Sequence, residues 1–186
     1  DYKFVKEIKL RILKLNNMTS KKNAGILFGG KSTEHQISII SARNVFKNTD
    51  TSLFDPYLIF VDHKGRWYQI SEKQFLAREI KPDKKDALQI NFSEVPVTFQ
   101  KRSDPNPFHL DVIFPVLHGK NGEDGNMQGF LNILGIPFVG PDMFASAACM
   151  DKDIAKKLLA LAGIKIAKFV CLKKGETDGI NYYKII

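Results

Sequence analysis

Hydrophobic and polar residues alternate along the chain in blocks that predict strands separated by helices. Short apolar runs at residues 24–28, 57–61 and 111–117 have the length and composition of buried strands. Between the first two runs, residues 34–48 carry apolar side chains at helical spacing. The face of this helix that we expect to be buried consists of Ile37, Ile40, Ser41, Val45 and Phe46.

The second half of the chain continues this alternation with three helices and two short strands. The helices are predicted to end near residue 134 and to cover 142–150 and 151–162, and the strands to cover 137–139 and 168–172. Gly163 follows the last helix, where glycine is the usual terminating residue. Strands that alternate with helices predict an α/β fold with a parallel sheet wound in Rossmann-like order.

Two segments interrupt this regular order. Residues 67–70 follow the second apolar run after a Gly-containing turn, which predicts an antiparallel hairpin. Residues 71–107 are charged and rich in proline, with short alternating pieces at 87–92 and 95–99. We interpret this region as an insertion of loops and edge strands.

The first strand carries a formal match to a phosphate-binding P-loop, Gly25-x-x-x-x-Gly30-Lys31-Ser32. In a working P-loop the residues between the glycines belong to a loop whose N–H groups face the phosphates. Here residues 26–28 are the apolar strand itself, which places Gly25 inside a strand. The match is therefore interpreted as a coincidence; a P-loop hydrolase would instead show nucleotide turnover that disappears in Lys31→Ala.

The residues after this strand place a carboxylate where α/β proteins bind their ligands. Thr33 and Gln36 have the spacing of a capping box, with Thr33 as the helix N-cap. Glu34 would then lie in the first helical turn, at the carboxyl end of the sheet. Such a carboxylate suits a small ammonium group, but first-turn acids also simply complement the helix dipole. Both interpretations stay open on the residues alone.

A second polar segment, His118-Gly-Lys-Asn-Gly-Glu-Asp-Gly125, follows the strongest predicted strand. Its three glycines allow a backbone to approach a ligand closely. His118, Glu123 and Asp124 bring polar groups to the same rim. The alternative is a tight strand-to-helix turn with a helix-capping acid, in which the histidine is structural.

Composition and charge exclude several other classes. The chain has 186 residues, is 44% hydrophobic and has a formal net charge of +8. Residues 1–17 hold five Lys or Arg and two acids, so the remaining basic side chains are thinly scattered. This scatter argues against a nucleic-acid partner. No apolar run has the roughly 20 residues of a membrane span, and the charges within residues 1–17 argue against a signal peptide.

The N-terminal stretch and the two cysteines each allow more than one interpretation. Residues 1–17 could form a surface helix, a helix that touches a membrane, or residues translated upstream of the true start, which we favour because Met18 begins a polar segment. Cys149 and Cys171 lack metal-ligand spacing and are expected to be buried thiols in a reducing compartment.

Three segments together resemble the N-terminal part of D-alanine–D-alanine ligases. They are LFGGKSTEHQIS at 27–38, DVIFPVLHGKNGEDGNMQGFL at 111–131 and PFVGPDMFASAACMDKDIAKKLL at 137–159. The resemblance covers about residues 22–172. It implies a Rossmann-like pre-ATP-grasp domain over 21–149, the start of an ATP-grasp domain over 150–186, and an extension over 1–20 outside the family.

The resemblance also implies an activity and its participants. Members of this family are ATP-dependent enzymes that join two D-alanines through a D-alanyl phosphate, for peptidoglycan synthesis in the bacterial cytoplasm. ATP and Mg²⁺ are the implied cofactors, D-alanine is the substrate, and the protein is expected to be a homodimer. The chain is expected to be an N-terminal fragment without activity of its own, with the Mg²⁺ ligands in the part that follows.

Site residues are implied by the same resemblance. Glu34 matches the glutamate that engages the ammonium of the first D-alanine, and His118 the histidine that lines the same subsite. Lys152 matches the lysine that reaches the ATP phosphates. Ser38 and Gly119 belong to the substrate site, where we expect them to shape it rather than react.

One departure from the family pattern and two rivals stay open. Gln36 stands where many members carry glutamate, which removes one negative charge beside the ammonium subsite. The rivals are a D-alanyl-D-serine or D-lactate ligase of the same superfamily and a truncated, non-catalytic remnant that binds amino acids.

Overall fold

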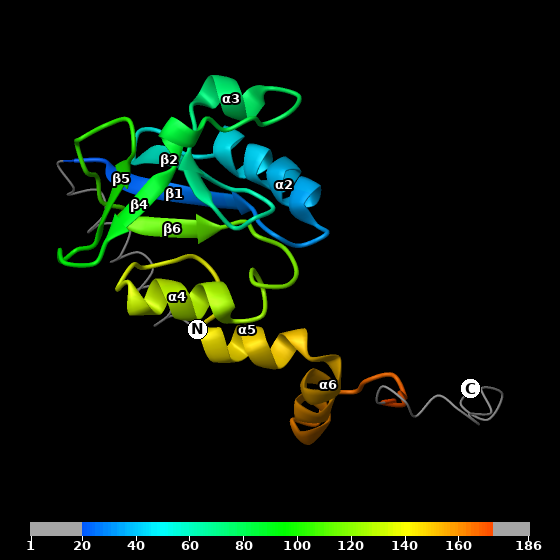
Figure 1. The fold of residues 1–186 in the computed structure, drawn as a ribbon. Coiled ribbons are helices and arrows are strands. Elements are labelled where there is room, and N and C mark those ends of the chain that lie inside the picture. The colour runs from blue at the N-terminus through cyan, green and yellow to red at the C-terminus, as the bar shows by residue number, and fades with distance from the viewer. Residues whose placement is uncertain (1–19, 173–186) are drawn as a thin grey trace.

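The computed structural model describes residues 20–172, and its centre is a four-stranded, mostly parallel sheet. The strand order is β3-β2-β1-β6 (Figure 1). The parallel strands are β1 (Lys22–Gly29), β2 (Phe54–Val61) and β6 (Val112–Pro115), and β3 (Trp67–Gln69) lies antiparallel to β2. The α/β fold and the hairpin predicted from the sequence are confirmed.

Helices cover both faces of this sheet. Helix α2 (His35–Lys47) lies over one face and α4 (Asn126–Ile133) over the other (Figure 1). Along β1, Leu27 packs into the core cluster that includes Leu131 of α4, whereas Phe28 packs into the cluster that includes Ile39 of α2. Because β1 is apolar on both faces, it is buried at the centre of the fold.

The buried face of α2 differs from the predicted one. Ile37 and Ile40 are each 55% exposed, whereas the buried positions are His35, Ser38, Ile39 and Ala42. The cause is Ser38, whose hydroxyl is hydrogen-bonded to the ends of two strands and so fixes the rotation of the helix. The prediction is therefore wrong for Ile37 and Ile40, whereas Val45 and Phe46 are partly buried and pack against the core cluster on this side of the sheet.

The predicted capping box of Thr33 and Gln36 is also wrong. Helix α2 begins at His35, so Glu34 is its N-cap residue rather than part of its first turn, and no side chain caps the helix there. A full capping box occurs instead at α3 (Glu72–Leu76), between Ser71 and Gln74. A capping box requires an N-cap residue whose backbone is extended. The backbone of Ser71 is extended, whereas that of Glu34 is in a turn conformation.

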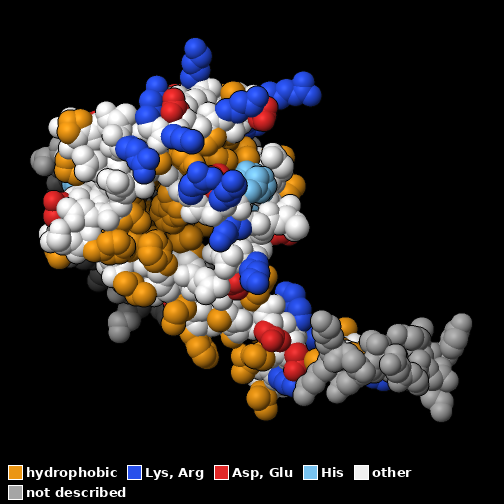
Figure 2. Space-filling view, in the orientation of Figure 1, with side chains coloured by type: hydrophobic (Ala, Val, Ile, Leu, Met, Phe, Trp, Pro, Cys, Tyr) orange, Lys and Arg blue, Asp and Glu red, His pale blue; other side chains and the backbone are white. Residues whose placement is uncertain are grey.

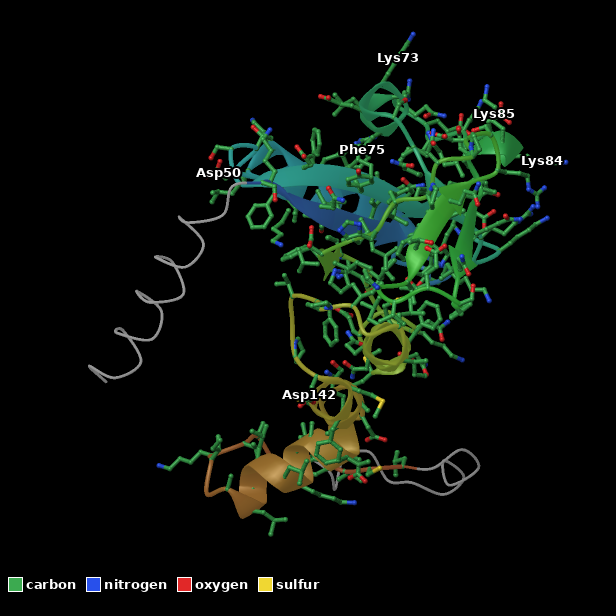
Figure 3. The ribbon with its side chains drawn as sticks, turned by 90° about the vertical axis from the view of Figure 1, so that its left-hand side faces the viewer. Asp50, Lys73, Phe75, Lys84, Lys85 and Asp142 are labelled. Atoms are coloured by element: carbon green, nitrogen blue, oxygen red, sulfur yellow. The ribbon has the colours of Figure 1, made fainter. Side chains whose placement is uncertain are left out.

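The inserted region consists of short elements, as predicted. It holds α3, a 3-10 turn at Lys84–Asp86, and an antiparallel pair, β4 (Leu88–Asn91) and β5 (Thr98–Lys101). Phe75 of α3 is fully buried against the α2 side of the sheet (Figure 3). The insertion thus adds to the core instead of forming a separate lobe.

The chain leaves the sheet through two helices, α5 (Met143–Met150) and α6 (Lys152–Leu161), which extend away from it (Figure 1). Asp142 caps α5 by accepting the Ala145 N–H, and Asp151 caps α6. The predicted strand at 137–139 is reduced to a single bridge between Phe138 and Ile113.

Two predictions for this end of the chain are wrong. Residues 168–172 form no strand, because no other strand of the described part lies beside them to supply hydrogen bonds. Cys149 and Cys171 are exposed rather than buried, since neither α5 nor the segment after α6 is covered on that side. The predicted extension over 1–20 lies almost wholly outside the described residues.

Within the described residues, none of the helices has both the length and the apolarity that crossing a membrane requires.

Candidate functional site

The P-loop interpretation is excluded by the position of Gly25. Gly25 pairs with Tyr57 of β2 on one side and with Ile113 of β6 on the other. Its backbone is therefore part of two strand ladders, and a Cβ at this position would lie 2.8 Å from Leu110 Cδ1. The residues between the two glycines of the pattern form a strand, as the sequence predicted.

The turn that follows β1 is the first part of the candidate site. Gly29 and Gly30 have φ values of +94° and +92°, in the region that side chains disfavour, and a Cβ on Gly29 would collide with the Val61 carbonyl. Ser38 Oγ accepts the Gly29 N–H at 2.8 Å and donates to the Val116 carbonyl at 2.6 Å. Ser38 is fully buried, so it holds the ends of β1 and β6 together.

Ser32 joins this turn to the glycine-rich segment after β6. Its hydroxyl donates to the His118 carbonyl at 2.7 Å and accepts the Glu34 N–H at 3.2 Å. Two segments that are 86 residues apart in the sequence are thereby fixed side by side. Sequence reasoning missed Ser32, because a serine in a glycine turn has no distinctive signal.

Glu34 and Gly119 meet across this junction. Gly119 has φ +68°, and a Cβ on it would lie 2.9 Å from Glu34 Oε2. The two residues line an open hollow of about 540 Å³ together with Ser32, Lys120 and other residues of the two segments. Position 119 favours glycine because its φ is positive, and a Cβ there would also displace the Glu34 carboxylate from its present place.

His118 is oriented by two polar partners. Its Nδ1 lies 3.3 Å from Glu123 Oε1, and its Nε2 lies 3.1 Å from Ser41 Oγ. Because a carboxylate only accepts, the Nδ1–H donates to Glu123, and the hydroxyl of Ser41 can donate to Nε2 of the neutral ring. Glu123 also accepts the Gly119 N–H at 2.7 Å, so one carboxylate fixes both the ring and the loop.

Asp124 is the helix-capping acid that a tight strand-to-helix turn predicts for this segment. It accepts the N–H groups of Asn121 at 2.9 Å and Asn126 at 3.2 Å, at the start of α4. Its carboxylate is thereby committed to the backbone. The segment is both a capped turn and the rim of a hollow.

Lys152 lies on the other side of the same loop. It is the first residue of α6, is exposed, and lines a cleft of about 580 Å³ with His118 and Glu123. Glu34 does not line this cleft. The structure therefore brings Glu34 to Gly119 and His118 to Lys152, in two hollows that share the 118–123 loop.

Within residues 20–172, no group of three His, Cys, Asp or Glu side chains is placed to hold a metal ion.

Comparison with known proteins identifies the family. Residues 23–141 match the family described as D-ala D-ala ligase N-terminus. The chain belongs to this family. A D-alanine–D-alanine ligase of Proteus mirabilis is 38% identical over 177 residues, which are 90% of this chain and 48% of that ligase. The chain thus spans about half the length of the curated relatives it matches.

Solved structures agree with this assignment. The D-alanine–D-alanine ligase of Coxiella burnetii matches with a TM-score of 0.71 and 37% identity, over 80% of this chain and 43% of that one. The VanG D-Ala:D-Ser ligase of Enterococcus faecalis matches with a TM-score of 0.69 and 39% identity, over 80% and 44%. A ligase of Bacillus anthracis solved with ATP matches at 0.57 with 28% identity, over 89% and 42%.

Proposed function

We propose that this chain is the N-terminal part of an ATP-dependent ligase that joins two D-alanines in the cytoplasm for peptidoglycan synthesis. The observation that carries the proposal is that Glu34 and Gly119 line one open hollow, where Ser32 is hydrogen-bonded both to the Glu34 N–H and to the His118 carbonyl. Family membership and the ATP complex of the Bacillus anthracis relative support it.

Each side chain has a role that follows from its chemistry. Glu34, an exposed carboxylate at the carboxyl end of the sheet, would receive the ammonium of the first D-alanine by a charge-assisted hydrogen bond. His118, whose ring is held by Glu123, lines the adjoining cleft and would contact the same substrate where the two hollows meet at the 118–123 loop. Gly119 and Ser38 would keep the two segments at the required separation.

Lys152 would hold the ATP phosphates. Lys152 lines the same cleft as His118 and is the first residue of α6, where positive charge from the side chain and the helix dipole add. Cationic groups at this place stabilise the negative charge that develops during phosphoryl transfer. Mg²⁺, when bound, supplies further charge neutralisation, and we place its ligands outside the described residues, which do not fit a metal site.

The experiment is a kinetic assay of the full-length product of this reading frame, with D-alanine, ATP and phosphate release as the readout. Glu34→Gln should raise the D-alanine concentration needed for half-maximal rate by about 10- to 100-fold, because it removes the charge facing the ammonium. ATP binding should be spared. Glu72→Gln, which removes a carboxylate on α3, is the matched control.

A second variant tests the nucleotide side of the proposal. Lys152→Ala should weaken ATP binding while leaving the D-alanine requirement nearly unchanged, and the exposed Lys165→Ala is its control. Equal kinetics in Glu34→Gln and the parent protein would refute the assignment of the ammonium site. Nucleotide turnover without any D-alanine dependence would refute the ligase itself.

A second function, D-alanyl-D-serine ligation, is favoured by one observation. The chain is 39% identical to the VanG D-Ala:D-Ser ligase, which is no less than its identity to the Coxiella burnetii enzyme. Supplying D-serine or D-lactate as the second substrate in the same assay decides between these products. Amino-acid binding without turnover would indicate the non-catalytic remnant, and the implied homodimer is tested by the mass of the protein in solution.

A further inference from the structure

A third hollow, of about 450 Å³, lies apart from the site proposed above. It is formed by α2, the β2–β3 hairpin and residues 78–84 of the insertion, and none of Glu34, His118 and Lys152 lines it. Figure 2 shows Lys and Arg side chains gathered on this part of the surface next to histidine. We call it the hairpin hollow.

The hairpin hollow carries a surplus of positive charge. Its walls include Arg43, Arg66, Arg78 and Lys84, and two carboxylates, Asp62 and Glu79. Both carboxylates are already paired: Asp62 lies 3.3 Å from Arg66 Nε, and Glu79 lies 3.0 Å from the ammonium of Lys81. Among the described residues, Arg43, Arg78 and Lys84 have no carboxylate partner. Three cations that share one hollow favour a doubly charged anion over a singly charged one.

Arg43 is held rigidly although it has no counter-charge. Its guanidinium donates to the carbonyl of Phe75 at 3.0 and 3.2 Å and to that of Ala77 at 2.7 Å. These bonds also anchor α3, which is a sufficient structural reason for the residue. They leave its full positive charge at a fixed place in the wall, where it contributes to the potential of the hollow.

Two histidines form the end of the hollow. The rings of His35 and His63 stack with their centroids 3.8 Å apart and an interplanar angle of 26°. His35 Nδ1–H donates to the Gly30 carbonyl at 2.6 Å, which leaves Nε2 as the titratable nitrogen. Burial lowers the pKa of His35 and outweighs the hydrogen bond to the Gly30 carbonyl, which opposes the shift; the neighbouring His63 adds a smaller lowering. An anion bound here would favour the protonated ring, which makes the pair a reporter of occupancy.

The floor of the hollow is apolar. Ile39, Phe60 and Tyr68, which are almost fully buried, line it together with Ile40, which is 55% exposed. A cationic rim above an apolar floor fits a ligand that has a dianionic head and a small hydrophobic body. We propose that the hairpin hollow binds a small phosphate monoester, with its phosphate at Arg78 and Lys84 and its organic part over Ile39, Phe60 and Tyr68. The proposal rests only on these walls and is independent of the ligase activity.

The test is a titration of the 186-residue chain followed by the imidazole resonances of its four histidines. The probes are phenyl phosphate and inorganic phosphate, added against chloride at constant ionic strength and at a pH where phosphate is mainly dianionic. Signals of His35 and His63 should shift and saturate, whereas that of His109, outside the hollow, should not move. Phenyl phosphate should saturate at a lower concentration than inorganic phosphate, because only its ring reaches the floor.

Two variants locate the phosphate. Replacing Arg78 and Lys84 together by glutamine should raise the half-saturating concentration about tenfold or more. Lys85→Gln is the matched control, since Lys85 is adjacent in the chain, pairs with Asp83 and does not line the hollow. Figure 3 shows the Lys84 and Lys85 side chains leaving the 3-10 turn in different directions. The control should change the concentration by less than about twofold.

Three outcomes would overturn the proposal. The first is a response that does not saturate, and the second is equal binding by the double variant and the parent. The third is a shift confined to His118, which would place the phosphate in the cleft beside Lys152 instead.

Discussion

Two regions of the molecule differ in how far their side chains are buried and hydrogen-bonded: the sheet with its glycine turns, and the pair of helices α5 and α6. In the sheet region four large side chains are fully buried: Leu27, Phe28, Ile113 and Leu131. The hydroxyl of Ser38 makes two hydrogen bonds, one as acceptor and one as donor. In the helical pair, Ser146 is the one buried residue, and its hydroxyl has no hydrogen-bond partner within the described residues.

The exposed side of α6 shows what this difference means. Ile154, Leu158 and Leu161 are 47%, 48% and 85% exposed, while Asp153 and Lys157 form an ion pair along the same helix. Such an amphipathic helix, with an apolar side open to solvent, is suited to contact with further protein. Within the described residues, the sheet region buries its own apolar side chains, whereas the apolar side of α6 is open to solvent.

The largest expected effect is a difference in the free energy of unfolding between two leucine-to-alanine variants. Leu131→Ala should lower the free energy of unfolding by about 2–5 kcal/mol, because it opens a cavity in the core. Leu158→Ala, in the half-exposed side of α6, should change it by about 0.5 kcal/mol or less. Urea unfolding of the two variants measures both values. Similar losses would mean that α6 is packed as tightly as the sheet.

A smaller difference in the free energy of unfolding is expected between variants of two buried serines. Ser38→Ala leaves the Gly29 N–H and the Val116 carbonyl without their partner, which should cost about 1–3 kcal/mol. Ser146→Ala removes a hydroxyl that makes no hydrogen bond and should be neutral or slightly stabilising. The same unfolding experiment applies. A clear loss in Ser146→Ala would show that its hydroxyl has a partner after all.

The smallest effect concerns the pH dependence of stability. Burial lowers the pKa of His35 below its ordinary value of 6.5, so the unfolded chain binds this proton more readily than the folded one. The contribution of His35 to stability is therefore constant above about pH 6.5 and falls as the pH drops from there to its folded pKa. His35→Gln, which has no titratable group at this position, should remove this part of the pH dependence.

The control for this measurement is His109→Gln, because His109 lies outside the hairpin hollow and the part of the pH dependence that His35 contributes should remain in this variant. Asp62 faces His35 and His63, but its own pKa is lowered: burial opposes the shift and the N–H groups of Arg66 and Lys64 outweigh it. Its titration therefore lies at lower pH. An unaltered profile in His35→Gln would contradict the buried, neutral histidine.

Local patterns were sufficient for most elements. The sequence predicted the strand at 24–28, the β2–β3 hairpin and the helices α5 and α6. It did so because their apolar periods and turn glycines are short-range signals. The buried face of α2 was not, because Ser38, a polar residue, faces inward to bond two strand ends. The exposure of Cys149 was also missed, since apolar neighbours in sequence do not reveal what covers them.

The sequence by itself determined most of the alternation of strands and helices up to α6 and the failure of the P-loop match, because these depend on side-chain period and on neighbours in the chain. Only the tertiary structure decided that Ser32 joins two segments 86 residues apart, that Glu34 meets Gly119, and that the hairpin, α2 and the insertion enclose a basic hollow. Those contacts depend on the rotation of α2 and the register of the parallel strands, which long-range packing fixes and no local pattern records.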